Sequence, residues 1–303
     1  MPATLVAGFL EAGKTTWIQD CILHDYFHKR GTTLILALED GETVYDTAAL
    51  KAYRTEVAVA ESGEDITAFC REALDRVRPD RVYVELNAMR PELRTLLPDC
   101  LKVVFTAALI DFTTLPLYYQ NMRQQLQAVV AGADQVIFNR CPDKALLAEY
   151  GNAFRLMNNR ASWLWEGPTG YHEKAFGILV PYDLTRPELT LDTTDFVAFM
   201  LDGRAAPEHY AGKTVRFLCQ ADALPEPGRF LAGRLVMTCC MADLQFMGFP
   251  CEYDGPEQPR PGSWHELTAE VALRPDAWGR PQLILLARSL TRATPPEKLI
   301  CGA

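Results

Sequence analysis

The sequence near the amino terminus reads Gly8-Phe9-Leu10-Glu11-Ala12-Gly13-Lys14-Thr15, which completes the Gly-x-x-x-x-Gly-Lys-Thr pattern of a phosphate-binding loop. Glycines let the backbone wrap closely, so that its N–H groups point at phosphate oxygens. Lys14 is expected to reach the β and γ phosphates, and Thr15 to offer a hydroxyl to Mg²⁺. An apolar run at residues 4–7 precedes the loop and a helical pattern at 15–29 follows it. The predicted phosphate-contacting residues are Gly8, Glu11, Ala12, Gly13, Lys14, Thr15 and Thr16.

Around this loop, short apolar runs alternate with helical stretches as far as residue 180. The runs lie at 33–38, 57–60, 81–85, 103–110 and 135–138, and the helical stretches include 66–77 and 118–131. Apolar strands separated by helices are typical of a parallel sheet covered on both faces. The sequence therefore predicts an α/β fold, with a P-loop nucleotide-binding domain and a mostly parallel sheet at residues 1–180.

From residue 211 the pattern changes to strands and turns. Strand-like runs lie at 215–221, 234–240, 249–253, 264–273 and 282–289, with Pro-Gly turns at 227–228 and 261–262. Five strands without a long helix predict a small all-β barrel of OB type at 211–303, and we expect the segment 205–303 to fold alone. Residues 181–210, with a short helical stretch near 196–201, are expected to be a linker.

Composition narrows the class of protein. The 303 residues carry a net charge of −9, which argues against nucleic acid as a partner. No apolar run is long enough to span a bilayer, and the amino terminus lacks the pattern of a signal peptide. Nine cysteines, an odd count, suggest reduced thiols rather than a disulfide framework. We expect a cytoplasmic protein that does not span a membrane.

Acidic residues follow the predicted strands at the edge where nucleotides bind. Glu85 ends the run at 81–85, and Glu39, Asp40 and Glu42 follow the run at 33–38. Carboxyl ends of parallel strands meet at one edge of the sheet, and P-loop proteins need a carboxylate to hold Mg²⁺ or orient water. We interpret Glu85 and Glu39 as catalytic candidates, Glu85 also as a Mg²⁺ partner with Thr15, and Asp111 as a weaker candidate. The competing interpretation of each is a solvated turn.

These features together resemble the CobW-type GTPases, relatives of UreG and HypB that serve metal delivery. The resemblance covers most of residues 1–180 and includes the P-loop, the acidic segment 39–42, Glu85, Asp111 and the segment 133–140. It implies GTP binding with slow hydrolysis, Mg²⁺ as cofactor, and the handling of a metal such as zinc for a client protein. It also implies that Asn139 and Arg140 belong to the loop that reads the guanine base.

The sequence departs from the family pattern at three places. The Cys-x-Cys-Cys metal motif expected before Glu85 is absent, and Pro142 stands where the guanine loop has Asp, with Asp143 one residue later. Leu86-Asn87-Ala88 replaces Thr-Ser/Thr-Gly after Glu85. GTP and ATP therefore both remain open as the bound nucleotide.

The second domain resembles the carboxyl-terminal domain of YcgQ-like bacterial proteins, over residues 215–293 and around Thr238-Cys239-Cys240-Met241-Ala242-Asp243. That resemblance implies association with a membrane permease. Cys219, Cys239, Cys240 and Cys251 fall within one stretch of this domain, and thiolates could hold zinc or copper. Adjacent residues of a strand face opposite ways, so Cys239 and Cys240 can share a metal only if the strand bulges or ends there. Core packing of these cysteines is the competing interpretation.

Two functions follow from the sequence. The first is a slow GTPase switch linked to metal handling or to a permease. The second is a binding module that holds nucleotide without hydrolysing it, while the barrel binds a metal or a partner.

Overall fold

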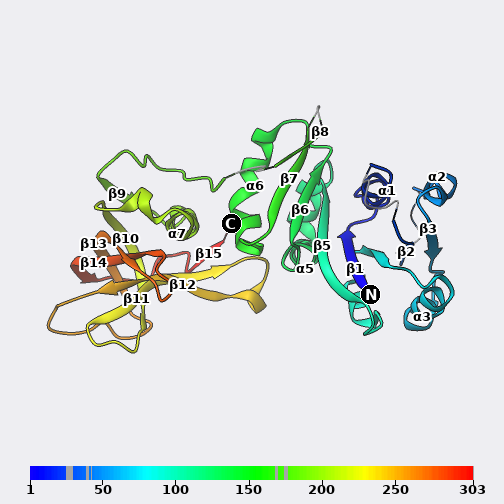
Figure 1. Ribbon diagram of the computed structural model, residues 1–303. Coiled ribbons are helices and arrows are strands. Elements are labelled where there is room, and N and C mark those ends of the chain that lie inside the picture. The colour runs from blue at the N-terminus through cyan, green and yellow to red at the C-terminus, as the bar shows by residue number, and fades with distance from the viewer. Residues whose placement is uncertain (25–29, 39–40, 42, 168–169, 174–176, 303) are drawn as a thin grey trace. The chain divides into compact units, whose positions relative to one another are not determined.

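The computed structural model describes residues 1–303 except 25–29, 39–40, 42, 168–169, 174–176 and 303. The chain divides into two compact units (Figure 1). Unit 1 comprises Met1–Leu147 and Met157–Phe176, and unit 2 comprises Ala148–Leu156 and Gly177–Ala303.

An eight-stranded sheet with the order β3-β2-β4-β1-β5-β6-β7-β8 forms the middle of unit 1. Neighbouring strands are parallel except for β8, which runs antiparallel to β7 at the edge. The strands are β1 Pro2–Gly8, β2 Thr33–Ala37, β3 Thr55–Val59, β4 Arg81–Asn87, β5 Lys102–Asp111, β6 Gln135–Asn139, β7 Ser162–Gly167 and β8 Gly170–Glu173. The predicted α/β class and mostly parallel sheet are confirmed.

Helices cover this sheet because its strands are apolar on both faces. In β2, Leu34 and Leu36 pack in one core cluster while Ile35 and Ala37 pack in another. The helices of unit 1 are α1 Lys14–His24, α2 Thr47–Lys51, α3 Ile66–Val77, α4 Leu115–Asn121 and α5 Arg123–Val130, with a 3₁₀ turn at Pro91–Leu96. Helix α6 Lys144–Met157 begins in unit 1, and its residues Ala148–Leu156 belong to unit 2. The single helix expected at 118–131 is two helices that meet at Met122, and α2, α6, β7 and β8 were not expected.

A closed five-stranded barrel forms the core of unit 2. Strand β10 pairs with both β11 and β13, and the ring is completed by the pairs β11–β12, β12–β14 and β14–β13. The barrel strands are β10 Thr214–Ala223, β11 Arg229–Met237, β12 Gln245–Glu252, β13 Trp264–Pro275 and β14 Pro281–Arg292, and β15 Ile300–Gly302 pairs with β11. In this ring β12 and β14 are parallel and the other neighbouring pairs are antiparallel. Because the ring of five strands closes, the expected small barrel is confirmed.

Residues 181–210 are built into unit 2 rather than joining two domains as a linker. Strand β9 Glu188–Leu191 pairs in parallel with β10, and helix α7 Asp195–Ala205 is buried from Phe196 to Gly203. Phe199 contacts the rings of Phe217 and Phe249, which belong to barrel strands. The apolar character of α7 on all sides fits a helix enclosed in a core. Among the helices in the described part of the chain, none is long and apolar enough to cross a membrane.

Candidate functional site

The P-loop connects the end of β1 at Gly8 to the start of α1 at Lys14, as the motif requires. Two residues of the loop adopt left-handed backbone conformations, Gly13 with φ of 86° and Glu11 with φ of 57°. A β-carbon on Gly8 would lie 2.6 Å from the Leu109 carbonyl oxygen, and one on Gly13 would lie 2.7 Å from Asn139 Nδ2. Both motif glycines are therefore required by the close packing of the loop, and Gly13 is required also by its left-handed conformation.

Lys14 is buried inside the loop that precedes it. Its ammonium group donates hydrogen bonds to the carbonyl oxygens of Phe9 at 2.7 Å and Gly8 at 3.2 Å. Only 2% of the residue is exposed. An ammonium group at this point of a glycine loop is placed where it can contact phosphate oxygens.

Thr15 and Glu85 form the second half of the site. Thr15 Oγ1 donates to Glu85 Oε1 at 3.0 Å, and the Tyr45 hydroxyl donates to Glu85 Oε2. Glu85 is 3% exposed and lies on β4, beside β1. A hydroxyl and a carboxylate are hard oxygen ligands of the kind Mg²⁺ prefers, so the donor set beside Lys14 fits this ion. Tyr45 was not expected from the sequence, because nothing in its local pattern points to Glu85.

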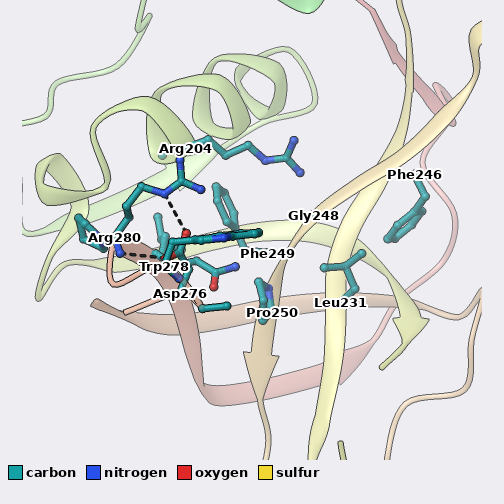
Figure 2. Close-up of a pocket in the computed structure, with 14 residues that line it drawn as sticks. Arg204, Leu231, Phe246, Gly248, Phe249, Pro250, Asp276, Trp278 and Arg280 are labelled. Atoms are coloured by element: carbon teal, nitrogen blue, oxygen red, sulfur yellow. Dashed lines mark hydrogen bonds and ion pairs between the residues drawn. The ribbon is translucent and has the colours of Figure 1, made fainter. Parts of the chain in front are cut away.

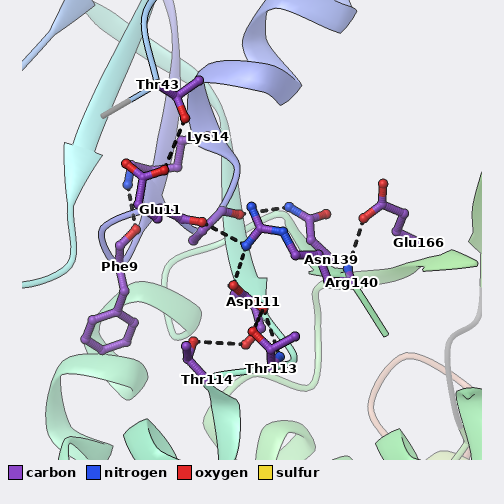
Figure 3. A network of polar contacts seen from close by, with 11 residues as sticks. Phe9, Glu11, Lys14, Thr43, Asp111, Thr113, Thr114, Asn139, Arg140 and Glu166 are labelled. Atoms are coloured by element: carbon purple, nitrogen blue, oxygen red, sulfur yellow. Dashed lines mark hydrogen bonds and ion pairs between the residues drawn. The ribbon is translucent and has the colours of Figure 1, made fainter. Parts of the chain in front are cut away.

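Arg140 joins three strand ends around the loop (Figure 3). Its Nη1 donates to the backbone oxygen of Glu11 at 3.0 Å and forms an ion pair with Asp111. Its backbone N–H donates to Glu166 Oε2 at 2.9 Å. Asp111 is fixed from its other side by Thr113, whose N–H and hydroxyl both donate to Oδ1. The guanidinium thus ties the ends of β5 and β6 to the P-loop.

Asn139 and Asp143 both have structural partners in the segment expected to read the base. Asn139 is 4% exposed, and its Nδ2 donates to the Ala12 carbonyl oxygen at 2.8 Å. Asp143 Oδ1 accepts a hydrogen bond from the N–H of Ala145 at 2.8 Å, in the first turn of α6. Asn139 therefore holds the P-loop, and Asp143 caps a helix.

Two adjoining cavities open beside the loop. The smaller, of about 30 Å³, is lined by Lys14, Thr15, Glu85 and Arg140 among others. The larger, of about 180 Å³, extends from Thr15 and Glu85 towards Tyr45 and Val57. The smaller cavity coincides with the predicted phosphate position. The larger cavity extends from it over β2 and β3.

The structure thus brings together most of the predicted nucleotide residues. Gly8, Glu11, Ala12, Gly13, Lys14, Thr15, Glu85, Asn139 and Arg140 are linked by the contacts above, and Thr16 lies exposed in the first turn of α1. Glu39, predicted as catalytic, lies outside the described residues, as do Asp40 and Glu42. Thr43, next to that segment, donates to Glu11 Oε2 at 3.1 Å.

The four cysteines predicted to form a thiolate site occupy two different environments. Cys219 and Cys251 are fully buried in the barrel core. Burial raises the pKa of the Cys219 thiol to about 12. Cys239 and Cys240 lie half-exposed after the end of β11 at Met237. The structure therefore does not gather the predicted four-thiolate set, and the core pair matches the packing interpretation.

A pocket of about 670 Å³ opens on the barrel (Figure 2). Its walls come from β11, β12, the hairpin between β13 and β14, and the end of α7. Arg280 lies over the Trp278 ring, with 5.2 Å from its guanidinium carbon to the ring centre, and its Nε donates to Asp276 at 3.1 Å. Arg204 of α7 also lines this pocket. The pocket combines aromatic and cationic surface.

Residues 171–278 match the family model of the DUF1980 C-terminal domain. This match confirms that a recognised domain follows the P-loop domain, and it begins well before residue 211, consistent with the inclusion of β9 and α7 in unit 2. The match spans about a third of the chain. Comparison with curated proteins gave no match.

Several solved structures are partly similar to the chain. Hydrogenase maturation factor HypB from Archaeoglobus fulgidus is 15% identical, with a TM-score of 0.38, over 56% of this chain and 82% of its own. HypB from Helicobacter pylori in complex with nickel is 13% identical, with a TM-score of 0.35, over 55% and 78%. Signal recognition particle 54 kDa protein from Aeropyrum pernix in complex with GDP is 12% identical, with a TM-score of 0.39, over 57% and 43%.

Proposed function

We propose that unit 1 binds a nucleoside triphosphate with Mg²⁺ and hydrolyses it slowly, and that this cycle acts as a switch in metal handling. The observation that carries the proposal is the buried Lys14 ammonium inside a glycine loop, next to the Thr15–Glu85 pair. A loop of this kind offers backbone N–H groups and a cation to phosphate oxygens, and the start of α1 adds its positive dipole end.

The residues that would hold Mg²⁺ are Thr15 and Glu85. Bound there, the ion would neutralise charge on the phosphates, which is its usual contribution to phosphoryl transfer. Tyr45 donates to one oxygen of Glu85 and Thr15 to the other, so the carboxylate is held in one orientation. A fixed carboxylate of this kind can orient a water molecule without reorganisation.

Slow turnover is supported by the segment after Glu85. The Ala88 N–H donates to the Gly8 carbonyl oxygen at 2.9 Å, and Asn87 Oδ1 accepts from the Met89 N–H at 2.8 Å. The first bond ties the end of β4 to the P-loop and the second closes a local turn. A switch segment, in contrast, has to move when the γ-phosphate is lost. We infer that hydrolysis and the movement coupled to it are slow.

GTP is the nucleotide implied by the resemblance to CobW-type proteins, and ATP is the alternative. The departure at Pro142 moves the acidic residue to Asp143, one oxygen of which caps α6. Calorimetric titration with GTP and with ATP, each with Mg²⁺, measures the preference directly. If Asp143 reads guanine, Asp143→Asn will reduce affinity for GTP and leave affinity for ATP unchanged.

A second function remains compatible with this geometry, a module that binds nucleotide without useful hydrolysis. The bond between Ala88 and Gly8 favours it, because a segment held to the P-loop moves less readily in response to the γ-phosphate. A multiple-turnover assay of phosphate release from the full chain separates the two functions. Phosphate release that stops after about one equivalent, or none, would select the binding module.

Lys14→Ala should abolish nucleotide binding and leave the fold intact, because it removes the cation from the loop while α1 and β1 keep their packing. The measurement is titration calorimetry with the preferred nucleotide, with circular dichroism to check the fold. Lys51→Ala is the matched control, since Lys51 is an exposed lysine in the same unit. Unchanged affinity in Lys14→Ala would rule out the P-loop assignment.

A further inference from the structure

The connection between β11 and β12 brings three metal-ligand side chains together. Strand β11 ends at Met237, β12 begins at Gln245, and a 3₁₀ turn lies between them at Met241–Asp243. Ligand atoms of Cys239, Cys240 and Asp243 all lie within 4.8 Å of one another. The three residues are half-exposed, so a solute can reach them.

The two cysteines converge because the regular strand has already ended before them. Alternation of side chains between opposite faces applies only within a strand, and Cys239 and Cys240 follow its last residue. This adjacent pair can share one ion because the strand has ended before Cys239.

The Asp243 carboxylate is oriented before any ion binds. Its Oδ2 accepts the N–H of Cys239 at 2.7 Å, and its Oδ1 accepts the N–H of Thr238 at 3.0 Å. These bonds hold the carboxylate against the cysteine pair and close the turn.

We propose that this turn is a zinc site, with the Cys239 and Cys240 thiolates and the Asp243 carboxylate as ligands and a fourth position open to an external ligand. Thiolates select zinc or copper(I) among biological metals, and the hard carboxylate favours Zn²⁺ over copper(I). On binding, each S–H bond breaks, each sulfur keeps the electron pair and donates it to the ion, and two protons leave to solvent.

A site with three protein ligands suits an ion that is transferred rather than held permanently. Structural zinc sites are closed by four protein ligands, whereas sites with three leave one position for exchange. The ligand assignment stands on the geometry of the turn alone. The interpretation of the ion as cargo rests on the metal-handling function proposed above.

The test is metal binding by the full chain, purified without a histidine tag, stripped of metal and kept reduced. We expect about one equivalent of Zn²⁺ in competition with a chromophoric chelator, and Co²⁺ should give thiolate-to-metal charge-transfer absorption. Loss of an outer-shell partner alone costs 10- to 100-fold in metal affinity. Cys239→Ser, Cys240→Ser and Asp243→Asn should therefore each weaken Zn²⁺ binding by about a hundredfold or more.

The matched controls are Cys100→Ser, at an exposed cysteine of unit 1, and Asp254→Asn, at an exposed aspartate of unit 2. Both should bind Zn²⁺ as the unmodified protein does. Equal Zn²⁺ affinity in the site variants and the controls would overturn the proposal. So would copper(I) binding that depends on the cysteines in a protein that fails to bind Zn²⁺.

A second measurement covers the case in which Asp243→Asn disrupts the turn. Alkylation of the unmodified protein, mapped by mass spectrometry, should show Cys239 and Cys240 protected by Zn²⁺ and Cys100 reacting at the same rate with and without it. Equal rates at Cys239 and Cys240 would exclude the site. Nucleotide titration of the same samples separates the two proposals, because either site can be present when the other is not.

Discussion

The position of Glu85 follows from its own strand, whereas its hydrogen-bond partners come from distant parts of the chain. Its place at the end of an apolar strand is a local property, and it was predicted from the sequence. Its two hydrogen bonds come from Thr15 on α1 and Tyr45 before α2, far apart along the chain. The carboxylate is therefore fixed by residues that no sequence window contains.

Glu85→Gln should slow hydrolysis by at least about tenfold and change nucleotide affinity much less, because a group that positions water or Mg²⁺ acts mainly in the transition state. Single-turnover kinetics and calorimetry on the same variant give the two quantities. Glu56→Gln, at an exposed glutamate of β3, is the control. Equal turnover in Glu85→Gln and the unmodified protein would remove Glu85 from the catalytic role and point to the acidic segment at 39–42.

At the scale of an element, α7 shows how a short helix becomes part of a barrel. Eight consecutive residues of it are buried, from Phe196 to Gly203. The Phe199 ring lies 5.0 Å from the Phe249 ring centre and 5.2 Å from that of Tyr210. A surface helix shows an apolar stripe on one side only, whereas α7 is buried on all sides. Without such a stripe, the sequence at 196–201 predicted only a short helix within a linker.

Phe199→Ala should lower the free energy of unfolding by about 3–5 kcal/mol, the usual cost of emptying a phenylalanine site in a core. Trp278→Ala, in which a residue 78% exposed is truncated, should change it by no more than about 0.5 kcal/mol. Denaturant unfolding followed by circular dichroism measures both. Similar losses in the two variants would contradict the position assigned to α7.

At the scale of the whole molecule, the boundary between the units lies earlier than the sequence suggests. Strand β9 and α7 precede residue 211, yet their residues Leu189, Leu191 and Phe196 share one core cluster with the barrel strands. A barrel cut off at residue 205 would expose the side of the core that α7 covers.

The fragment 177–303 should therefore fold, and the fragment 205–303 should not. The longer piece keeps β9 and α7 against the barrel, whereas the shorter one loses the apolar area that they bury. Thermal unfolding followed by circular dichroism should show a cooperative transition for 177–303 alone. A transition of equal sharpness and midpoint in 205–303 would restore the original expectation that the five strands are sufficient.

The P-loop, the parallel apolar strands around it and the small barrel could all be predicted from the sequence alone. Each of these depends on a pattern within one window: a glycine spacing, a continuous apolar run, or a strand bounded by Pro-Gly turns. Glu85, Asn139 and Arg140 could be placed near the loop because the carboxyl ends of parallel strands meet at one edge.

The contacts between polar side chains, in contrast, could be seen only in the folded chain. Tyr45 reaches Glu85, Arg140 reaches Asp111, and Cys239 and Cys240 meet Asp243 while Cys219 and Cys251 turn into the core. The physical reason is that periodicity reports which face of an element is apolar, whereas the partner of a polar side chain depends on where strands end and how distant segments pack. The end of β11 at Met237 is the clearest case, since it alone lets two adjacent cysteines face the same carboxylate.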